Sequence, residues 1–191
     1  FAGAKVTGVK FNNETIDAFV ADADTLMVSA VINGVGTLDI TTDTDVDAIY
    51  DKIKNFFKEY NELMTEMATK YNAPSAGDYE PLTEAEEEEL SETQLEKWEG
   101  ILKTASLRRD GTLSTVMSSM KSVMIKSYQI DGKTYSLSSF GIKTAGYFTA
   151  EDNEKANYHI DGDPDDESSK ANADKLKAAL VADPENTIEF F

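Results

Sequence analysis

The chain has 191 residues, of which 40% are hydrophobic and 9% aromatic, enough apolar material for one large domain or two small ones. Its 36 acidic and 18 basic residues give a net charge of −18, which repels nucleic-acid phosphates and disfavours anionic membrane surfaces. The absence of cysteine excludes disulfides, thiolate nucleophiles and cysteine-ligated metals. We therefore expect no nucleic acid and no membrane among its partners.

The sequence shows no secretory signal peptide, and no apolar run is long enough to span a bilayer. Its first residue is Phe1 rather than Met. We therefore expect a fragment of a longer protein, whose missing terminus could carry an export signal.

Residues 1–43 have the pattern of short β-strands. Alternating or β-branched residues occur at 5–9, 25–32 and 37–41, and the last of these alternates as a half-buried strand does. Turns are predicted at Asn12-Asn13 and Asn33-Gly34. Because so few strands cannot cover both faces of a sheet, we expect either the closing part of a β-rich head domain or a sheet that leans on the helices.

The segment from Asp45 to Tyr71 predicts a long amphipathic helix. Its apolar residues recur at steps of three and four, at Val46, Ile49, Tyr50, Ile53, Phe56, Phe57, Tyr60, Leu63, Met64 and Met67. Thr44 or Asp45 can cap its first turn. At about 1.5 Å per residue the helix would reach roughly 40 Å. An apolar face of that length is expected to pack within its own domain, and it could also pack against another chain.

Two further helices are predicted after a loop at residues 72–81. Capping-box patterns occur at Thr83 with Glu86 and at Ser91 with Gln94. The second helix carries Leu95, Trp98, Ile101, Leu102 and Ala105 on one side, and the third, from Asp110, carries Leu113, Val116, Met117, Met120, Val123 and Met124. We expect each of the three helices to bury its apolar stripe against the other two.

The C-terminal third combines short strands with short helices. Asp131-Gly132 between two β-rich runs predicts a hairpin, and residues 141–148 and 157–160 predict further strands. Residues 161–173 are polar and are expected to form a surface insertion. A helix is predicted over residues 174–181, with Leu176, Leu180 and Val181 inward, and a closing helix starts at Asp183-Pro184.

The predicted fold class is therefore α+β: a helical bundle with three main helices plus short β-hairpins, preceded by strands from a β-rich head domain. We predict two parts, a strand segment over residues 1–43 and a mostly helical leg domain over residues 44–191.

No residue pattern indicates an enzyme or a cofactor. His159 is the only histidine and lies in a predicted strand, without a nucleophile motif to accompany it. Trp98 is at helical spacing with Leu95 and Leu102, so core packing is its expected role. Arg108-Arg109 follows the second helix, where cations favour the negative helix end.

Two acidic runs are candidates for hard cations. Asp161, Asp163 and Asp165 supply the oxygen ligands that Ca²⁺ prefers, but the run departs from the EF-hand pattern at Gly162 and Pro164. An acidic, solvated loop is the preferred interpretation. The run from Glu84 to Glu89 is likewise interpreted as a solvated helix start.

Seven strings of residues, taken in order and spacing, resemble one known family. They are FFKEYN at 56–61, YEPLT at 79–83, LEKWEG at 95–100, LRRDGTL at 107–113, LSSFGIKT at 137–144, YHID at 158–161 and LKAALVADPENTIEFF at 176–191. Over residues 43–191 they closely resemble the C-terminal region of the flagellar filament capping proteins, also called hook-associated protein 2. Residues 1–42 are similar to the closing strands of that family's head.

This resemblance implies a secreted, non-enzymatic structural protein that forms a cap at the tip of the bacterial flagellum. The implied partners are flagellin, whose folding and insertion the cap promotes, and further copies of the chain in a ring, commonly a pentamer. Export by the flagellar type III apparatus would need no cleaved signal peptide. The resemblance does not extend to the family's terminal coiled-coil segments, which we expect to lie outside this sequence at both ends. Insertions at 128–134 and 163–173 depart from the family pattern.

We hypothesise that the polar face of the first helix and the loop at 72–81 contact flagellin or the next subunit, through Lys52, Lys58, Glu62 and Tyr79. Two alternatives stay open. One is an adhesin for mucin or host glycans, for which exposed aromatic residues on the strands, with Phe11 and Phe19 available, would be evidence. The other is an extracellular module stabilised by Ca²⁺ at residues 161–167.

Overall fold

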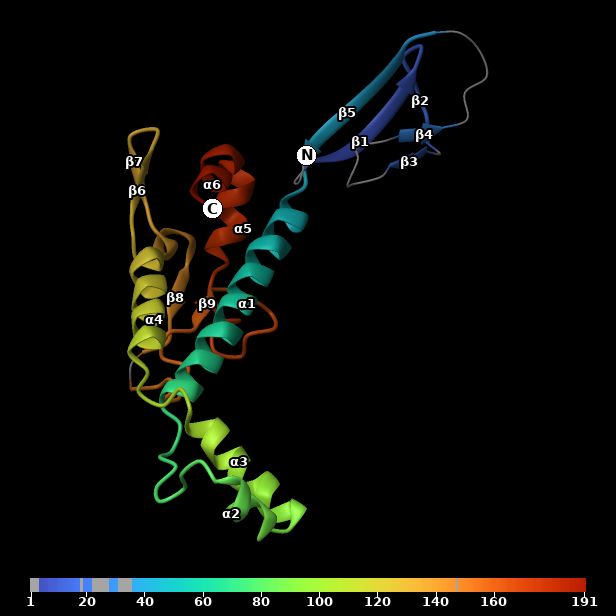
Figure 1. Ribbon diagram of the computed structural model, residues 1–191. Coiled ribbons are helices and arrows are strands. Elements are labelled where there is room, and N and C mark those ends of the chain that lie inside the picture. The colour runs from blue at the N-terminus through green and yellow to red at the C-terminus, as the bar shows by residue number, and fades with distance from the viewer. Residues whose placement is uncertain (1–3, 18, 22–27, 31–35, 147) are drawn as a thin grey trace. The chain divides into compact units, whose positions relative to one another are not determined.

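The computed structural model describes residues 4–17, 19–21, 28–30, 36–146 and 148–191 (Figure 1). The chain divides into two compact units. Unit 1 comprises residues 1–56, 129–135 and 160–191, and unit 2 comprises residues 57–128 and 136–159. The secondary structure is α+β, as predicted. The predicted division into domains 1–43 and 44–191 stays a prediction.

The N-terminal part of unit 1 is an antiparallel sheet in the order β2-β1-β5. Strand β1 (Ala4–Phe11) is central and pairs with β2 (Glu14–Thr15) and β5 (Leu38–Thr44). The predicted turn between β1 and β2 is confirmed, because Asn12 and Asn13 have φ angles of 50° and 68°, which asparagine tolerates better than most residues. A second pair joins β3 (Phe19–Ala21) to β4 (Val28–Ala30).

Strand β5 differs from its predicted half-buried state. Val9 on β1 is only 1% exposed, but Leu38 and Ile40 on β5 are 44% and 47% exposed. An edge strand buries a side chain only where another layer covers its face, which the alternation of residues cannot reveal. The predicted strand at 25–32 and the turn at Asn33-Gly34 fall largely outside the described residues.

Helix α1 (Val46–Tyr71) runs through both units. Of its two candidate caps, Asp45 is the one used, since its carboxylate accepts from the backbone N–H of Ala48 at 3.3 Å. Most of its apolar stripe is buried, at Ile49, Tyr50, Ile53, Phe57, Tyr60, Met64 and Met67. Phe56 and Leu63 were also expected inward but are 53% and 46% exposed. They lie at the edge of the stripe, where spacing alone does not fix which side chains the core covers.

The core of unit 2 lies between α1 and α4 (Gly111–Met124). Tyr60, Met64, Met67 and Ala68 of α1 pack with Met117 of α4. Helix α4 begins where predicted, because the carboxylate of Asp110 accepts from the backbone N–H of Leu113 at 2.6 Å. Val116 and Val123, which were assigned to the inward face of α4, are 45% and 55% exposed.

Helices α2 (Glu84–Glu88) and α3 (Glu92–Ala105) bury no residue at all. Both predicted capping boxes are confirmed: the Glu86 carboxylate accepts from the backbone N–H of Thr83 at 2.8 Å, and Gln94 Oε1 accepts from that of Ser91 at 3.0 Å. The expectation that α3 buries its stripe against two other helices is therefore wrong. A helix can carry an amphipathic pattern without finding a partner in its own chain.

The predicted hairpin is confirmed as β6 (Tyr128–Ile130) and β7 (Lys133–Tyr135), with positive φ angles at Asp131 and Gly132. A 3₁₀ turn over Leu137–Phe140 is followed by β8 (Ile142–Thr144), which pairs with β9 (Tyr158–Ile160). These strands correspond to the two predicted at 141–148 and 157–160.

Unit 1 closes with α5 (Lys175–Ala182) and α6 (Pro184–Phe190). Leu176 and Leu180 are fully buried, as predicted, but Val181 is 68% exposed. The two helices meet at Asp183, whose carboxylate accepts from the backbone N–H of Asn186 at 3.4 Å. The Asp183 carbonyl accepts from the hydroxyl of Thr187 at 2.7 Å.

Candidate functional site

The acidic segment after β9 is an ordered, partly buried loop rather than the solvated surface insertion that the sequence predicts. Asp161 and Asp163 are only 4% and 7% exposed. The hydroxyl of buried Ser169 donates to the Ile160 carbonyl at 2.8 Å, and the Ser169 carbonyl accepts from the backbone N–H of Gly162 at 2.9 Å. Gly162 has a φ of 85°, and a side chain there would press on the backbone of Asp174. The loop therefore has a defined conformation.

Lys54 of α1 lies between two carboxylates of this loop. Its Nζ donates to Asp163 Oδ1 and to Asp165 Oδ2, each at 2.6 Å. Burial opposes the charge of Lys54, but the two hydrogen bonds outweigh it and raise the pKa of the ammonium group. The hydrogen bond from Lys54 lowers the pKa of Asp165. The candidate calcium ligands Asp163 and Asp165 are thus bound to a cation of the protein itself.

The third candidate ligand, Asp161, accepts from the side-chain amide of Asn172 at 2.7 Å. Among the described residues, no group of three or more His, Cys, Asp or Glu side chains is arranged to hold a metal ion. Each of the three candidate carboxylates is therefore held by a side chain of the protein itself, and the calcium site stays a hypothesis.

Two buried tyrosines on α1 have phenol groups in unusual surroundings. The Tyr60 hydroxyl is buried without a hydrogen-bond partner among the described residues, and the buried Tyr50 hydroxyl lies near the Asp174 carboxylate without a well-aligned hydrogen bond to it. Burial, and then the negative charges of Asp174 and Asp163, raises the pKa of Tyr50 to about 12. Burial, and then nearby Tyr158, raises the pKa of Tyr60 to about 12. Both phenols are neutral, structural groups at physiological pH.

The four residues that are hypothesised to form an interface differ in their exposure to solvent. Lys52, Lys58 and Glu62 are exposed on α1, where a partner could reach them. Tyr79 is half-buried, and its ring packs edge-on against Trp98 with centroids 4.5 Å apart. The first three are free to contribute to a surface, whereas Tyr79 also holds α3 in place.

Trp98 is not a core residue. It is only half-buried, and its indole Nε1 donates to the Glu80 carbonyl at 2.8 Å. Together with the Tyr79 contact, this hydrogen bond ties α3 to the loop that follows α1. The helical spacing with Leu95 and Leu102 correctly placed Trp98 on the apolar side of α3, but that side faces a loop instead of a core.

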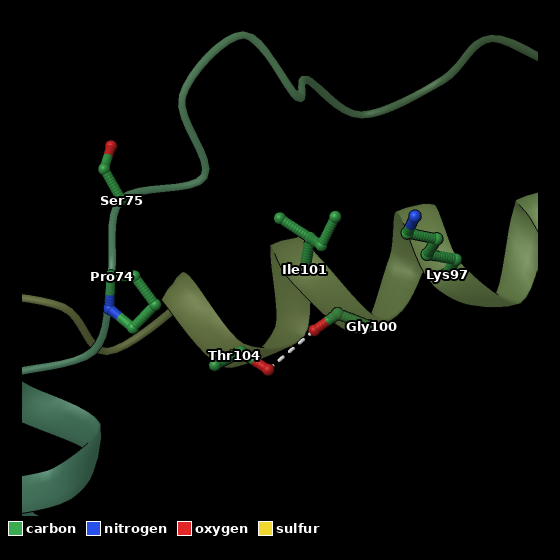
Figure 2. A pocket seen from close by; sticks show the side chains of 6 residues that line it. All are labelled: Pro74, Ser75, Lys97, Gly100, Ile101 and Thr104. Carbon is green, nitrogen blue, oxygen red and sulfur yellow. Dashed lines mark hydrogen bonds between the residues drawn. The ribbon is translucent and has the colours of Figure 1, made fainter.

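A groove opens between this loop and α3 (Figure 2). Its volume is about 350 Å³, and its lining comprises Pro74, Ser75, Lys97, Gly100, Ile101 and Thr104. The four α3 residues recur at helical spacing and so share one face of the helix. No pattern in the sequence predicted this groove. A glycine in the middle of an amphipathic helix was the available signal, since Gly100 leaves open space where another side chain would lie.

Arg109 has a role other than the predicted helix capping. Its φ is 57°, its backbone N–H donates to the Tyr71 carbonyl at 3.0 Å, and its guanidinium lies 5.3 Å from the centroid of the Tyr71 ring. Arg109 therefore fastens the start of α4 to the end of α1.

The remaining candidate residues from the sequence lie in or beside strands and helices. His159 is in β9, as predicted, and the Glu84–Glu89 run is exposed at and after the start of α2. Phe11 and Phe19, whose exposure would be evidence for glycan binding, are both half-buried. No helix within the described ranges is long and apolar enough to cross a membrane.

Comparison with known proteins decides the family. The profile of the family described as "Flagellar hook-associated protein 2 C-terminus" matches residues 5–191. The chain belongs to this family. The flagellar hook-associated protein 2 of Halalkalibacterium halodurans is 30% identical over 162 residues, which are 85% of this chain and 27% of that protein. The protein of the same name from Thermotoga maritima is 29% identical over 167 residues, 87% of this chain and 23% of that protein. No solved structure matches the chain.

Family membership confirms the resemblance seen in the sequence, and it classes the chain with structural proteins of the flagellum rather than with enzymes. The chain spans about a quarter of the length of these curated relatives.

The family strings contain residues that hold unit 2 together. In FFKEYN, Asn61 Nδ2 donates to the Tyr158 carbonyl and its Oδ1 accepts from the Tyr158 backbone N–H, each at 2.8 Å. In YHID, the same Tyr158 packs its ring against Phe57 and Tyr60. In LRRDGTL, Arg109 binds the end of α1 and Asp110 caps α4. The family pattern in this part of the chain is thus explained by packing rather than by a reactive site.

Proposed function

We propose that this chain is the C-terminal region of a structural cap at the tip of the bacterial flagellar filament, which promotes the folding and insertion of flagellin during filament growth. The observation that carries the proposal is the match of residues 5–191 to the hook-associated protein 2 family. The whole protein would act outside the cell, exported by the flagellar type III apparatus, and would assemble with copies of itself in a ring, as a pentamer.

The physical arrangement of α1 supports a role in weak, repeated contacts. A cap must hold its subunits together while new flagellin passes beneath it, so its contacts with flagellin need to form and break easily. Exposed Lys52, Lys58 and Glu62 can form such contacts, because exposed ion pairs contribute little free energy and are screened by salt.

The proposed contact surface consists of these three α1 residues and Tyr79. Its test is a combined Lys52→Ala, Lys58→Ala and Glu62→Ala variant of the full-length protein, expressed in a strain that lacks its own copy. We expect shorter filaments and more unpolymerised flagellin in the medium. Tyr79→Phe keeps the packing on Trp98 and tests the hydroxyl group alone.

Lys126→Ala is the matched control, because Lys126 is an exposed lysine beyond the end of α4. It should leave filament length unchanged. Normal filaments from the triple variant would remove α1 from the proposed contact surface. Normal filaments from a strain with no copy of the protein at all would overturn the cap function itself.

A further inference from the structure

Within unit 2, α1 and α4 carry large apolar side chains that are exposed to solvent. Leu63 of α1 is 46% exposed, and Val116 and Val123 of α4 are 45% and 55% exposed. Val116 and Val123 are seven residues apart, about two helical turns, so they lie on one side of α4. Single exposed apolar residues are common on protein surfaces, whereas a group of them on two packed helices indicates a contact surface.

Helical geometry places these side chains on the same side of the helix pair. Each of them directly precedes a methionine that packs in or against the core between the two helices, at positions 64, 117 and 124. The helices are antiparallel, because Arg109 before α4 is bound to Tyr71 at the end of α1 (Figure 1). In an antiparallel pair, one step back from the contact turns the side chains of both helices toward the same side, by about 100°. Leu63, Val116 and Val123 therefore border one seam between α1 and α4.

The opposite side of α1 is covered by the chain itself. Asn61 exchanges two hydrogen bonds of 2.8 Å with the backbone of Tyr158 in β9, and the Thr65 hydroxyl donates to Asn157 Oδ1 at 3.2 Å. Asn61 and Thr65 are each two residues from Leu63, which is about 200° around the helix. Strand β9 therefore lies on the side of α1 that is opposite to Leu63 and leaves the seam open.

The composition of α4 is atypical of a helix that faces water. Lys121 is the single charged residue among the 14 of α4, although 28% of the whole chain is charged. Lys121 does not lie on the seam, because it is two residues before Val123 and so about 200° from it. Beside Val116 and Val123, the α4 side of the seam carries the short hydroxyl residues Thr112 and Ser119. An uncharged face of short and apolar side chains is typical of a helix that packs closely against another helix.

The length of the relatives and the charge of this chain indicate the occupant of the seam. The chain spans about a quarter of those relatives, and the matching family is described as their C-terminus, so most of each relative precedes the matched part. A second copy of a chain with a net charge of −18 is repelled at low ionic strength. A segment of the same longer protein has a high effective concentration at the seam, because it is covalently linked to it.

We propose that the seam between α1 and α4 binds an α-helix from the part of the longer protein that precedes this chain, which completes a three-helix bundle in unit 2. Apolar residues of that helix, at spacings of three and four, would pack on Leu63, Val116 and Val123. Its short side chains would face Thr112 and Ser119, where α4 permits a close approach. This inference rests on the proposal that the chain is the C-terminal region of a longer protein, but not on the cap function.

Thiol labelling of the full-length protein tests whether the seam is covered. Val123→Cys is introduced as the only cysteine, with any cysteine outside this chain replaced by serine, since the 191 residues contain none. Ser118→Cys is the matched control, because Ser118 is exposed on α4 and lies about 140° around the helix from Val123. Relative to the rates in urea, we expect a maleimide to label Val123→Cys at least about tenfold more slowly than Ser118→Cys, because a covered thiol reacts only when the covering helix detaches.

Photocrosslinking identifies the segment that covers the seam. Val116 of the full-length protein is replaced by p-benzoylphenylalanine, and mass spectrometry locates the crosslinked peptide. We expect a peptide that precedes this chain in the same molecule, so a mixture of isotopically labelled and unlabelled copies should give no mixed products.

Equal labelling rates of the two cysteine variants would overturn the proposal. So would a mixed crosslink or a crosslink to flagellin, because another molecule would then occupy the seam. Circular dichroism verifies the helix content of each variant, and Val116→Cys replaces Val123→Cys if the latter does not fold. Neither measurement depends on filament growth, so a failure here is distinguishable from a failure of the cap function.

Discussion

The ammonium group of Lys54 provides the positive charge for two carboxylates of the loop after β9. Replacing it in Lys54→Met keeps most of the side-chain volume but leaves Asp163, which is 7% exposed, without its ionic partner. We expect the free energy of unfolding at pH 7 to fall by about 2–3 kcal/mol, because an unpaired buried charge is costly. Urea denaturation measures this change. Lys170→Met, which removes an exposed pair with Glu167, is the control and should have no measurable effect.

The same contact predicts the response to calcium. Because Lys54 already binds Asp163 and Asp165, we expect millimolar Ca²⁺ to leave the melting temperature unchanged relative to a chelator. Differential scanning calorimetry tests this. A rise in melting temperature that disappears in Asp163→Asn would contradict this expectation and support the calcium site.

The buried phenols of Tyr50 and Tyr60 should weaken the fold at high pH. In the folded chain their pKa values are about 12, whereas an unfolded tyrosine loses its proton near pH 10. Above pH 10 the unfolded state therefore releases protons that the folded state retains, and stability falls until about pH 12. We expect a loss of at most about 3 kcal/mol for each phenol. Thermal melts between pH 8 and 12 measure it.

Tyr60→Phe separates this effect from general alkaline damage. Its hydroxyl has no hydrogen-bond partner, so its removal should raise stability at neutral pH by about 1 kcal/mol and reduce the alkaline loss. An unchanged slope between pH 10 and 12 would show that the phenol ionises in the folded chain as easily as in the unfolded one.

At the scale of elements, Asn61 connects α1 to β9 through both of its side-chain groups. Asn61→Ala removes two hydrogen bonds to the Tyr158 backbone and leaves that N–H and carbonyl without these partners. We expect a loss of about 1–3 kcal/mol in the free energy of unfolding. Asn55→Ala, at an exposed position on the same helix, controls for the change in helix propensity and should alter stability little.

Hydrogen exchange at the Tyr158 amide gives an independent measurement of the same connection. Its N–H should exchange much faster in Asn61→Ala than in the parent chain. Unchanged protection would mean that the strand is held by β8 alone.

Elements specified by neighbouring residues were predictable from the sequence. The capping boxes at Thr83 and Ser91, the Asp131-Gly132 hairpin and the start of α6 at Asp183-Pro184 depend on contacts within four positions. The family strings also identified the family correctly.

Contacts between distant residues were not predictable. Lys54 and Asp163 are 109 positions apart, and nothing near either residue indicates the other. The half-buried state of the α3 stripe and the groove beside Gly100 were not predicted, for a related reason. The periodicity of hydrophobic residues predicts that one face of a helix is apolar. It does not predict whether another part of the chain packs against that face.

At the scale of the whole molecule, net charge governs self-association. With a charge of −18, copies of this 191-residue chain repel one another at low ionic strength. We therefore expect a monomer by light scattering coupled to size exclusion, next to a ring-sized assembly of the full-length protein. A ring formed by the 191-residue chain alone would contradict this expectation and would place the ring contacts within residues 1–191.

The order in which the two units use the chain has a consequence for its synthesis. Unit 1 takes its residues from the beginning, from a short central segment and from the end, and unit 2 takes the two stretches between. A nascent chain leaving the ribosome thus cannot complete unit 1 until the last helices have been translated. Unit 2 ends at residue 159, so all of its residues have been translated before α5 and α6. Unit 2 can therefore fold before unit 1, and a stop codon within α5 or α6 would leave unit 2 complete and unit 1 truncated.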